Sequence, residues 1–307
     1  MTVGTFEPFF VTGFQRSGTT LLRVIIDSHP DIAVPFDTVG LWERYWRQLD
    51  KYGNLRTPQE VRRMAGDILA EERIRLWEVP LDVDRILACR RREGFAGLME
   101  AFYRAYADHK GKRYWGDKDP GNMRRLHLVN EWFPCCRVVH IIRDGRDACL
   151  SLVEQPFGGN DVLQSARGWV EEVGWVRQIG AILGRDRYLE VIYESLIADP
   201  VTQTRRVCEF LRIDYSDAML AYHKHDSAIP REKRHLWRLI NQPPQAGNAA
   251  RWKREMSPAA RICLERRAGD LLRELGYETL TPPVRGGYSY ELWTIIKKVA
   301  SEFQRRS

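Results

Sequence analysis

The sequence has few of the features that mark a metal protein, a disulfide-bonded protein or a membrane protein. Its 307 residues include 6 cysteines, none in a Cys-x-x-Cys pair or at the spacing of zinc ligands. It has no apolar run of about 18 residues and no N-terminal signal-peptide pattern. It also has no linker rich in proline, glycine or serine and no repeat. These absences predict one domain over residues 1–285, with no metal, no membrane span and a cytoplasmic location.

Charge of one sign is in modest excess. The chain carries 48 basic and 41 acidic side chains, a formal net charge of +7. This excess suits a protein that binds an anionic small molecule. Because no basic stripe with interleaved aromatic residues accompanies a nucleic-acid motif, no nucleic-acid partner is expected.

A lysine is missing from the most informative segment of the chain. Residues 13–20, Gly-Phe-Gln-Arg-Ser-Gly-Thr-Thr, follow an apolar stretch and lead into residues 21–26, Leu-Leu-Arg-Val-Ile-Ile. This order is typical of a strand, a phosphate-binding loop and a helix, whose backbone N–H groups converge on an anion. Nucleotide triphosphatases have a lysine where Thr19 stands, whereas here Arg16 supplies the cation inside the loop. The loop therefore predicts binding of a phosphate-like group, but not ATP hydrolysis.

A second charged segment follows a buried-type strand at residues 137–142. The strand ends in Arg143-Asp144-Gly145-Arg146. Ligands of open α/β sheets bind at the carboxyl ends of the strands, so the guanidinium of Arg143 is well placed for a phosphate dianion. Taken alone, the cluster is also typical of a solvated turn with a local ion pair.

Both segments resemble motifs of the PAPS-dependent sulfotransferase family, most closely its bacterial and tyrosylprotein-sulfotransferase-like branch. The window from Arg16 through residues 27–32 to residues 36–38 resembles the family's 5′-phosphosulfate loop. Arg143, followed eight positions later by Ser151, resembles its 3′-phosphate motif. The resemblance implies an enzyme that moves a sulfuryl group from 3′-phosphoadenosine 5′-phosphosulfate (PAPS) to a hydroxyl or amine and releases adenosine 3′,5′-bisphosphate (PAP).

Three further segments occur in family order. Residues 115–120 resemble the Asn-Lys-Asp-Pro segment, residues 191–196 the Tyr-Glu-x-Leu strand end, and residues 248–253 the late loop with a basic residue beside Trp. Each also has an ordinary reading, as a turn lysine, a half-buried strand end or surface charge. Their shared order, over residues 9 to about 277, favours the resemblance.

The resemblance implies a set of site residues. Those expected to bind PAPS are Arg16, Ser17, Gly18, Thr19, Thr20, Arg143, Ser151, Tyr193, Arg251 and Trp252. Arg16 and Lys118 are expected to neutralise the leaving group during an in-line displacement. Asp37 is the candidate base, because it falls where the tyrosylprotein branch has its catalytic glutamate, although it is also placed as a turn or N-cap residue. Asp119 and His127 are reserve bases.

The fold class expected is α/β, with a P-loop-type central parallel sheet flanked by helices. Candidate strands at 9–13, 113–117, 137–143 and 187–192 alternate with helical segments. Residues 41–106 form a helical insert, in which an aromatic stripe either packs in the core or lines one wall of the acceptor site. The members of that stripe are Trp42, Tyr45, Trp46 and Leu49.

Two basic segments stand outside these motifs. Residues 231–238 are expected to form a solvated helix or an acceptor-site loop. Residues 286–307 form an amphipathic basic helix, expected to pack on the body of the enzyme or against a second copy, with membrane-surface contact a weaker alternative.

Two other function classes remain open. A P-loop kinase would need a cation near Thr19 and a Mg²⁺-binding aspartate, for which Asp144 could be mistaken. A non-catalytic PAPS or nucleotide-binding module would keep Arg16 and Arg143 without a working base. For an enzyme, the acceptor is a small molecule, a glycan or a peptide, and a homodimer is a further expectation. The Golgi tyrosylprotein enzymes carry a membrane anchor that this sequence lacks, which puts a secreted protein substrate in doubt.

Overall fold

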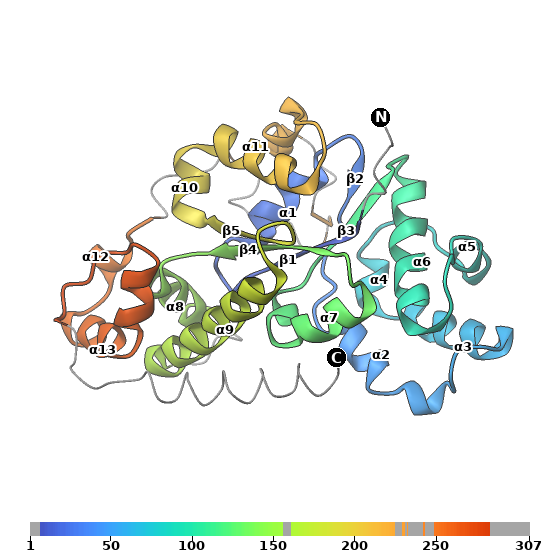
Figure 1. Cartoon of the computed structure of the whole chain (residues 1–307), viewed down its shortest axis with the longest axis horizontal. Coiled ribbons are helices and arrows are strands. Elements are labelled where there is room, and N and C mark those ends of the chain that lie inside the picture. Colours follow the sequence, from blue (N-terminus) through green and yellow to red (C-terminus); the bar gives the residue numbers. More distant parts are fainter. Residues whose placement is uncertain are drawn as a thin grey trace.

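A five-stranded parallel sheet forms the centre of the molecule (Figure 1). The computed structural model describes residues 7–155, 161–224, 229–230, 232, 242 and 249–282. The strand order is β2-β3-β1-β4-β5, and every neighbouring pair is parallel. The strands are β1 (Phe9–Thr12), β2 (Ile32–Ala33), β3 (Tyr114–Lys118), β4 (Arg137–Ile142) and β5 (Tyr188–Ile192).

The predicted fold class is confirmed, and the four predicted strands are present. All four residues of β1 and all six of β4 are buried, as expected for parallel strands covered on both faces. β2 was not predicted. It has two residues, and it pairs through Ile32 with Tyr114 and through Ala33 with Trp115.

Helices cover both faces of the sheet (Figure 1). α1, α10 and α11 lie on one face, while α7, α8, α9 and α13 lie on the other. These helices are α1 (Thr19–Asp27), α7 (Leu126–Trp132), α8 (Gly145–Val153), α9 (Val162–Leu183), α10 (Tyr193–Ala198), α11 (Pro200–Leu211) and α13 (Pro258–Glu274). The short α12 (Trp252–Glu255) precedes α13. Single 3₁₀ turns are η1 (Leu49–Lys51), η3 (Asp217–Met219) and η4 (Tyr222–Lys224), and η2 (Pro120–Arg125) follows β3.

The insert between β2 and β3 is helical, as predicted. It consists of α2 (Leu41–Trp46), α3 (Pro58–Leu69), α4 (Glu72–Arg75), α5 (Val83–Ala88) and α6 (Gly94–His109). Trp42 and Tyr45 are buried, whereas Trp46 is 36% exposed, so the aromatic stripe is only partly core. Tyr103 of α6 stacks on Trp115 of β3, with ring centroids 4.7 Å apart. This contact ties the insert to the sheet at the strand that carries Lys118.

Several sequence predictions fall outside this description. The C-terminal helix at 286–307 and all of the basic segment 231–238 except Glu232 lie beyond the described residues. Among the described helices, none is both long and apolar enough to cross a bilayer. All six cysteines are unpaired, and Cys149 is buried as a small apolar side chain.

Candidate active site

The loop between β1 and α1 is pressed against its neighbours so closely that two of its positions require glycine. A Cβ on Gly13 would lie 2.4 Å from the carbonyl oxygen of Ile141. A Cβ on Gly18 would lie 2.5 Å from Cδ2 of Tyr193, and Gly18 also has a φ of 92°. The loop therefore follows a path that a side chain at either position would block.

This loop offers hydrogen-bond donors to a ligand. α1 begins at Thr19, directly after the left-handed Gly18, so the free N–H groups of its first turn face the loop. Ser17 is completely buried, and its hydroxyl has no hydrogen-bond partner among the described residues. Because a buried polar group without a partner is costly, this hydroxyl fits an oxygen of a bound anion. Thr19 and Thr20 open the same helix.

Arg16 joins the loop to the second motif. Its Nε donates to Oγ of Ser151 at 3.2 Å, and its carbonyl oxygen accepts from the guanidinium of Arg143 at 3.0 Å. The guanidinium of Arg143 also lies 4.8 Å from the ring centroid of Tyr193. Residues from the loop after β1, from the end of β4, from α8 and from α10 thus meet at the carboxyl edge of the sheet, although Arg16 and Ser151 alone are 135 positions apart in the sequence.

Positive charge is concentrated at this edge. The pKa of Arg16 is lowered, first by burial and then by the charge of Arg143, with a smaller effect from Arg251. Cations that destabilise one another in this way gain most from a bound anion, because it offsets both burial and repulsion. The charges of Glu154 and Tyr193 act in the opposite direction.

The late loop contributes Arg251 and Trp252, but in different ways. Arg251 donates to Glu154 at 2.7 Å and to Glu255 at 2.6 Å, and these bonds raise its pKa. Trp252 is buried, with the guanidinium of Arg146 3.6 Å from its ring centroid. One ring face is therefore occupied by protein.

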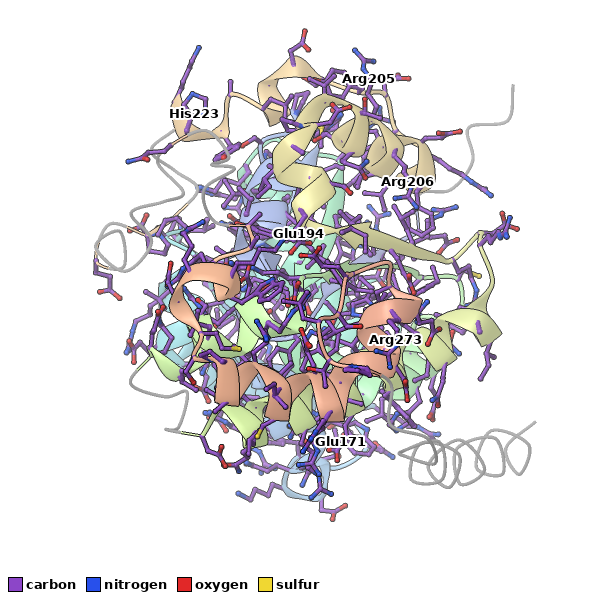
Figure 2. The ribbon with its side chains drawn as sticks, turned by 90° about the vertical axis from the view of Figure 1, so that its left-hand side faces the viewer. Glu171, Glu194, Arg205, Arg206, His223 and Arg273 are labelled. Atoms are coloured by element: carbon purple, nitrogen blue, oxygen red, sulfur yellow. The ribbon has the colours of Figure 1, made fainter. Side chains whose placement is uncertain are left out.

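Arg146 is a structural residue whose burial the sequence did not reveal. It lies almost completely buried between Asp144, at 2.7 Å, and Glu265 of α13, at 2.6 Å. The local ion pair expected for a turn is present, but it is buried rather than solvated. Glu194 braces the same turn, since its carboxylate accepts from the Asp144 N–H at 3.0 Å and from the Tyr277 hydroxyl at 2.8 Å. Figure 2 labels Glu194, in the first turn of α10, above the C-terminal helices in this view.

Lys118 and Asp37 interact electrostatically on the β3 side of the loop. Lys118 ends β3 and is buried, which lowers its pKa, while the charge of Asp37 is the largest effect in the opposite direction. Oδ1 of Asp37 accepts from Arg73 of α4 at 2.7 Å. Arg73 was missed by the sequence analysis because it is 36 positions away and belongs to no motif.

The two reserve bases have other surroundings. Asp119 is buried and accepts from the backbone N–H groups of Gly40 at 2.9 Å and of Gly121 at 2.6 Å. Burial and the neighbouring Asp117 raise its pKa to about 6. Asp119 therefore anchors two turns, and His127 lies half-buried on α7.

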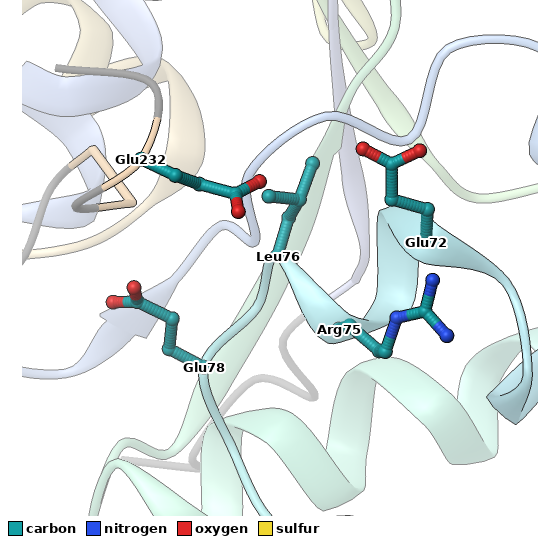
Figure 3. A pocket seen from close by; sticks show the side chains of 5 residues that line it. All are labelled: Glu72, Arg75, Leu76, Glu78 and Glu232. Atoms are coloured by element: carbon teal, nitrogen blue, oxygen red, sulfur yellow. The ribbon is translucent and has the colours of Figure 1, made fainter.

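A cavity of about 440 Å³ lies beside α4. Figure 3 shows carboxylates of α4, of the segment after it and of Glu232 around this hollow. Its lining residues are Glu72, Arg75, Leu76, Glu78 and Glu232. The same helix turn carries Arg73, so the cavity is next to the element that holds Asp37.

Comparison with known proteins decides the family. A sequence model described as the sulfotransferase family matches residues 8–217. The chain belongs to the sulfotransferase family. The sequence-based prediction of an enzyme that transfers sulfuryl groups is thereby confirmed.

Curated relatives of this sulfotransferase include protein-tyrosine sulfotransferase A of Caenorhabditis elegans, 24% identical over 295 residues, which cover 93% of this chain and 71% of the relative. Protein-tyrosine sulfotransferase 2 of Gallus gallus is 25% identical over 222 residues, 70% of this chain and 53% of the relative.

Two solved structures share the fold. The sulfotransferase domain of the Synechococcus PCC 7002 olefin synthase has a TM-score of 0.65 at 22% identity, covering 91% of this chain and 98% of the other. The sulfotransferase domain from the curacin biosynthetic pathway has a TM-score of 0.62 at 17% identity, covering 89% and 99%.

Proposed function

We propose that this sulfotransferase uses PAPS as donor and transfers the sulfuryl group to a hydroxyl or amine by in-line displacement, releasing PAP. The observation that carries the proposal is the contact of Arg16 with both Ser151 and Arg143. It brings the loop suited to a 5′-phosphate next to the residues expected to hold a 3′-phosphate.

The donor fits the residues present at this edge. The loop N–H groups and the unpartnered hydroxyl of Ser17 suit the 5′-phosphate, together with Thr19 and Thr20. Arg143 and Ser151 suit the 3′-phosphate. The donor's many negative charges would offset the burial and the repulsion that lower the pKa of Arg16.

Three side chains account for the transfer. Lys118 and Arg16 neutralise the charge that develops on the leaving phosphate, and Asp37 removes the proton of the acceptor. The electrostatic interaction between Asp37 and Lys118 supports this division, because the base and the leaving-group cation must both lie near the transferring sulfur. Catalysis then consists of positioning and charge stabilisation.

For the acceptor we propose a chemical class, a hydroxyl or an amine. The relatives are named protein-tyrosine sulfotransferases, so a tyrosyl phenol in a peptide belongs in a test panel beside alcohols, sugars and amines. Two features favour a role of the insert as one wall of the acceptor site. Its helix α4 carries Arg73, which bonds to Asp37, and the cavity lies beside the same helix. The cytoplasmic location and the homodimer remain predictions.

Donor selectivity tests the proposal. Wild type should bind PAP much more tightly than AMP, and Arg143→Ala should remove about 2–4 kcal/mol of PAP affinity while barely changing AMP affinity. Arg16→Ala should weaken both ligands, because both carry a 5′-phosphate. Calorimetric titration of each ligand into each protein gives the comparison.

Arg137→Ala is the matched control, since Arg137 is a buried arginine at the opposite end of the same strand. It should leave the preference for PAP unchanged. Equal losses for PAP and AMP in Arg143→Ala would mean that Arg143 only supports the loop. PAP binding without turnover of any acceptor would favour a non-catalytic binding module.

A further inference from the structure

The end of β3 places two buried carboxylates on either side of Lys118. Asp117 is completely buried, and Asp119 is 2% exposed. Both bind the segment that follows Asp37. The Thr38 hydroxyl donates to Oδ1 of Asp117 at 2.5 Å, and the Gly40 N–H donates to Oδ2 of Asp119 at 2.9 Å.

Asp117 also receives donors from two other elements. Asn122 of η2 donates through Nδ2 to Oδ2 of Asp117 at 3.0 Å. The Tyr103 hydroxyl of α6 accepts from Nε1 of Trp42 at 2.5 Å, so its own proton is available for its hydrogen bond to Asp117. Three donors at one carboxylate connect the insert, the segment of Thr38 and the strand end.

We propose that Asp117 is a positioning residue for the transfer reaction: by holding the Thr38 hydroxyl, it fixes the carboxylate of Asp37 relative to the ammonium group of Lys118. Asp117 itself touches neither donor nor acceptor. This inference rests on the proposed function, because it assigns Asp37 and Lys118 their roles.

The backbone of Asp37 shows why such an anchor matters. Asp37 has a φ of 48°, in the left-handed region that residues other than glycine rarely adopt. Such a conformation persists only where neighbouring contacts hold it. Thr38 is completely buried and is the next residue. A displacement of about 1 Å between reacting groups can cost about 10² in rate, so loss of the Thr38 anchor should reduce turnover.

Asp117 has a second effect, through its charge, that can be measured separately from its hydrogen bond to Thr38. The charged groups that face Lys118 are Asp37 after β2, Arg23 of α1, and Asp117 and Asp119 of its own strand end. The negative charge of Asp117 raises the pKa of Lys118 and thus opposes the effect of burial. Lys118 acts as a cation, so activity falls as the pH rises through its pKa. Asp117→Asn removes the negative charge and should move this alkaline limb to lower pH.

The test is a double-mutant cycle in the full chain. Thr38→Val and Asp117→Asn should each lower kcat by about 10–100-fold with PAP affinity within about 3-fold of wild type. The double variant should have a kcat no lower than that of the poorer single variant, because both substitutions break the same hydrogen bond, the one between Thr38 and Asp117. Thr38→Ser keeps the hydroxyl and should remain within about 3-fold of wild type. The pH profile of kcat in Asp117→Asn should show the shifted alkaline limb.

Glu100→Gln serves as the control, because Glu100 is another buried carboxylate and lies on α6 with Tyr103. It should lower Tm without lowering kcat at temperatures where the protein stays folded. Losses of kcat that multiply in the double variant would overturn the positioning role, and an alkaline limb that does not move in Asp117→Asn would overturn the electrostatic effect of Asp117 on Lys118. A wild-type protein that binds PAP but sulfates no acceptor would instead contradict the proposed function, and the positioning role with it.

Discussion

Asp37 combines an unfavourable backbone conformation with an ion pair. Its left-handed φ of 48° costs about 1–3 kcal/mol in a residue other than glycine. Its carboxylate is about one-third exposed and bonds to Arg73. The ion pair with Arg73 helps to hold this conformation, which fits the proposed role of a carboxylate that faces an incoming acceptor.

Replacement of Asp37 tests its role as the base. Asp37→Asn keeps the shape of the side chain and should lower kcat by about 10²–10⁴-fold, because the general base acts in the transition state. Affinity for PAP should stay nearly unchanged in calorimetric titration. If kcat remains within a few-fold of wild type, the role passes to another group, with His127 to be tested before the backbone-bonded Asp119.

The residues that the sequence did and did not reveal differ in one respect. Arg16, Ser17 and Gly18 could be identified because a phosphate loop is a local pattern, with its chemistry in a few consecutive residues. Arg73 and Glu154 could not. Their partners Asp37 and Arg251 are 36 and 97 positions away, and each pair meets only in the folded chain.

At the scale of elements, the phosphate loop between β1 and α1 packs directly on α10 at Gly18. Gly18 lies so close to the ring of Tyr193 that no side chain fits between them. Tyr193 in turn lies under the guanidinium of Arg143. The first turn of α10 therefore sets the position of both the phosphate loop and the Arg143 side chain.

Gly18→Ala should greatly weaken PAP binding, and it should destabilise the protein by more than the φ penalty alone. Gly111→Ala isolates that penalty, because Gly111 has a φ of 67° with nothing within 4 Å of an added Cβ. The control should lose about 1 kcal/mol of stability and keep its PAP affinity. Chemical denaturation and calorimetry measure the two effects. Equal stability loss in both variants, with PAP affinity retained in Gly18→Ala, would show that Tyr193 moves aside easily.

Helices and strands could be predicted where their own residues show a clear apolar pattern. β1 and β4 are mostly apolar and buried along their whole length, because both of their faces are covered. β2 has two residues and depends on pairing with β3, so no periodicity could indicate it. The insert was recognised as helical, but its attachment through Tyr103 to Trp115 and Asp117 depends on tertiary contacts that the sequence pattern does not contain.

At the scale of the whole molecule, the parallel sheet gathers cations at one edge. Lys118 ends β3, Arg143 follows β4, and Arg16 lies in the loop after β1. Since neighbouring strands run in the same direction, these three residues lie at the same edge of the sheet although they are dispersed over 128 positions. The net charge of +7 adds a long-range attraction for an anionic donor.

This gathering of cations predicts how the enzyme responds to metal removal. Nucleotide kinases use Mg²⁺ and a loop lysine to neutralise transferring phosphates, whereas this loop has Thr19 in place of the lysine and Arg16 within reach of Arg143. Protein cations can supply the same charge stabilisation, so sulfuryl transfer should persist in excess EDTA. Initial rates with PAPS and an active acceptor, measured with EDTA and again after addition of Mg²⁺, check this. Activity that EDTA abolishes and Mg²⁺ restores would show that the three cations do not suffice, and would favour kinase-like chemistry at this edge of the sheet.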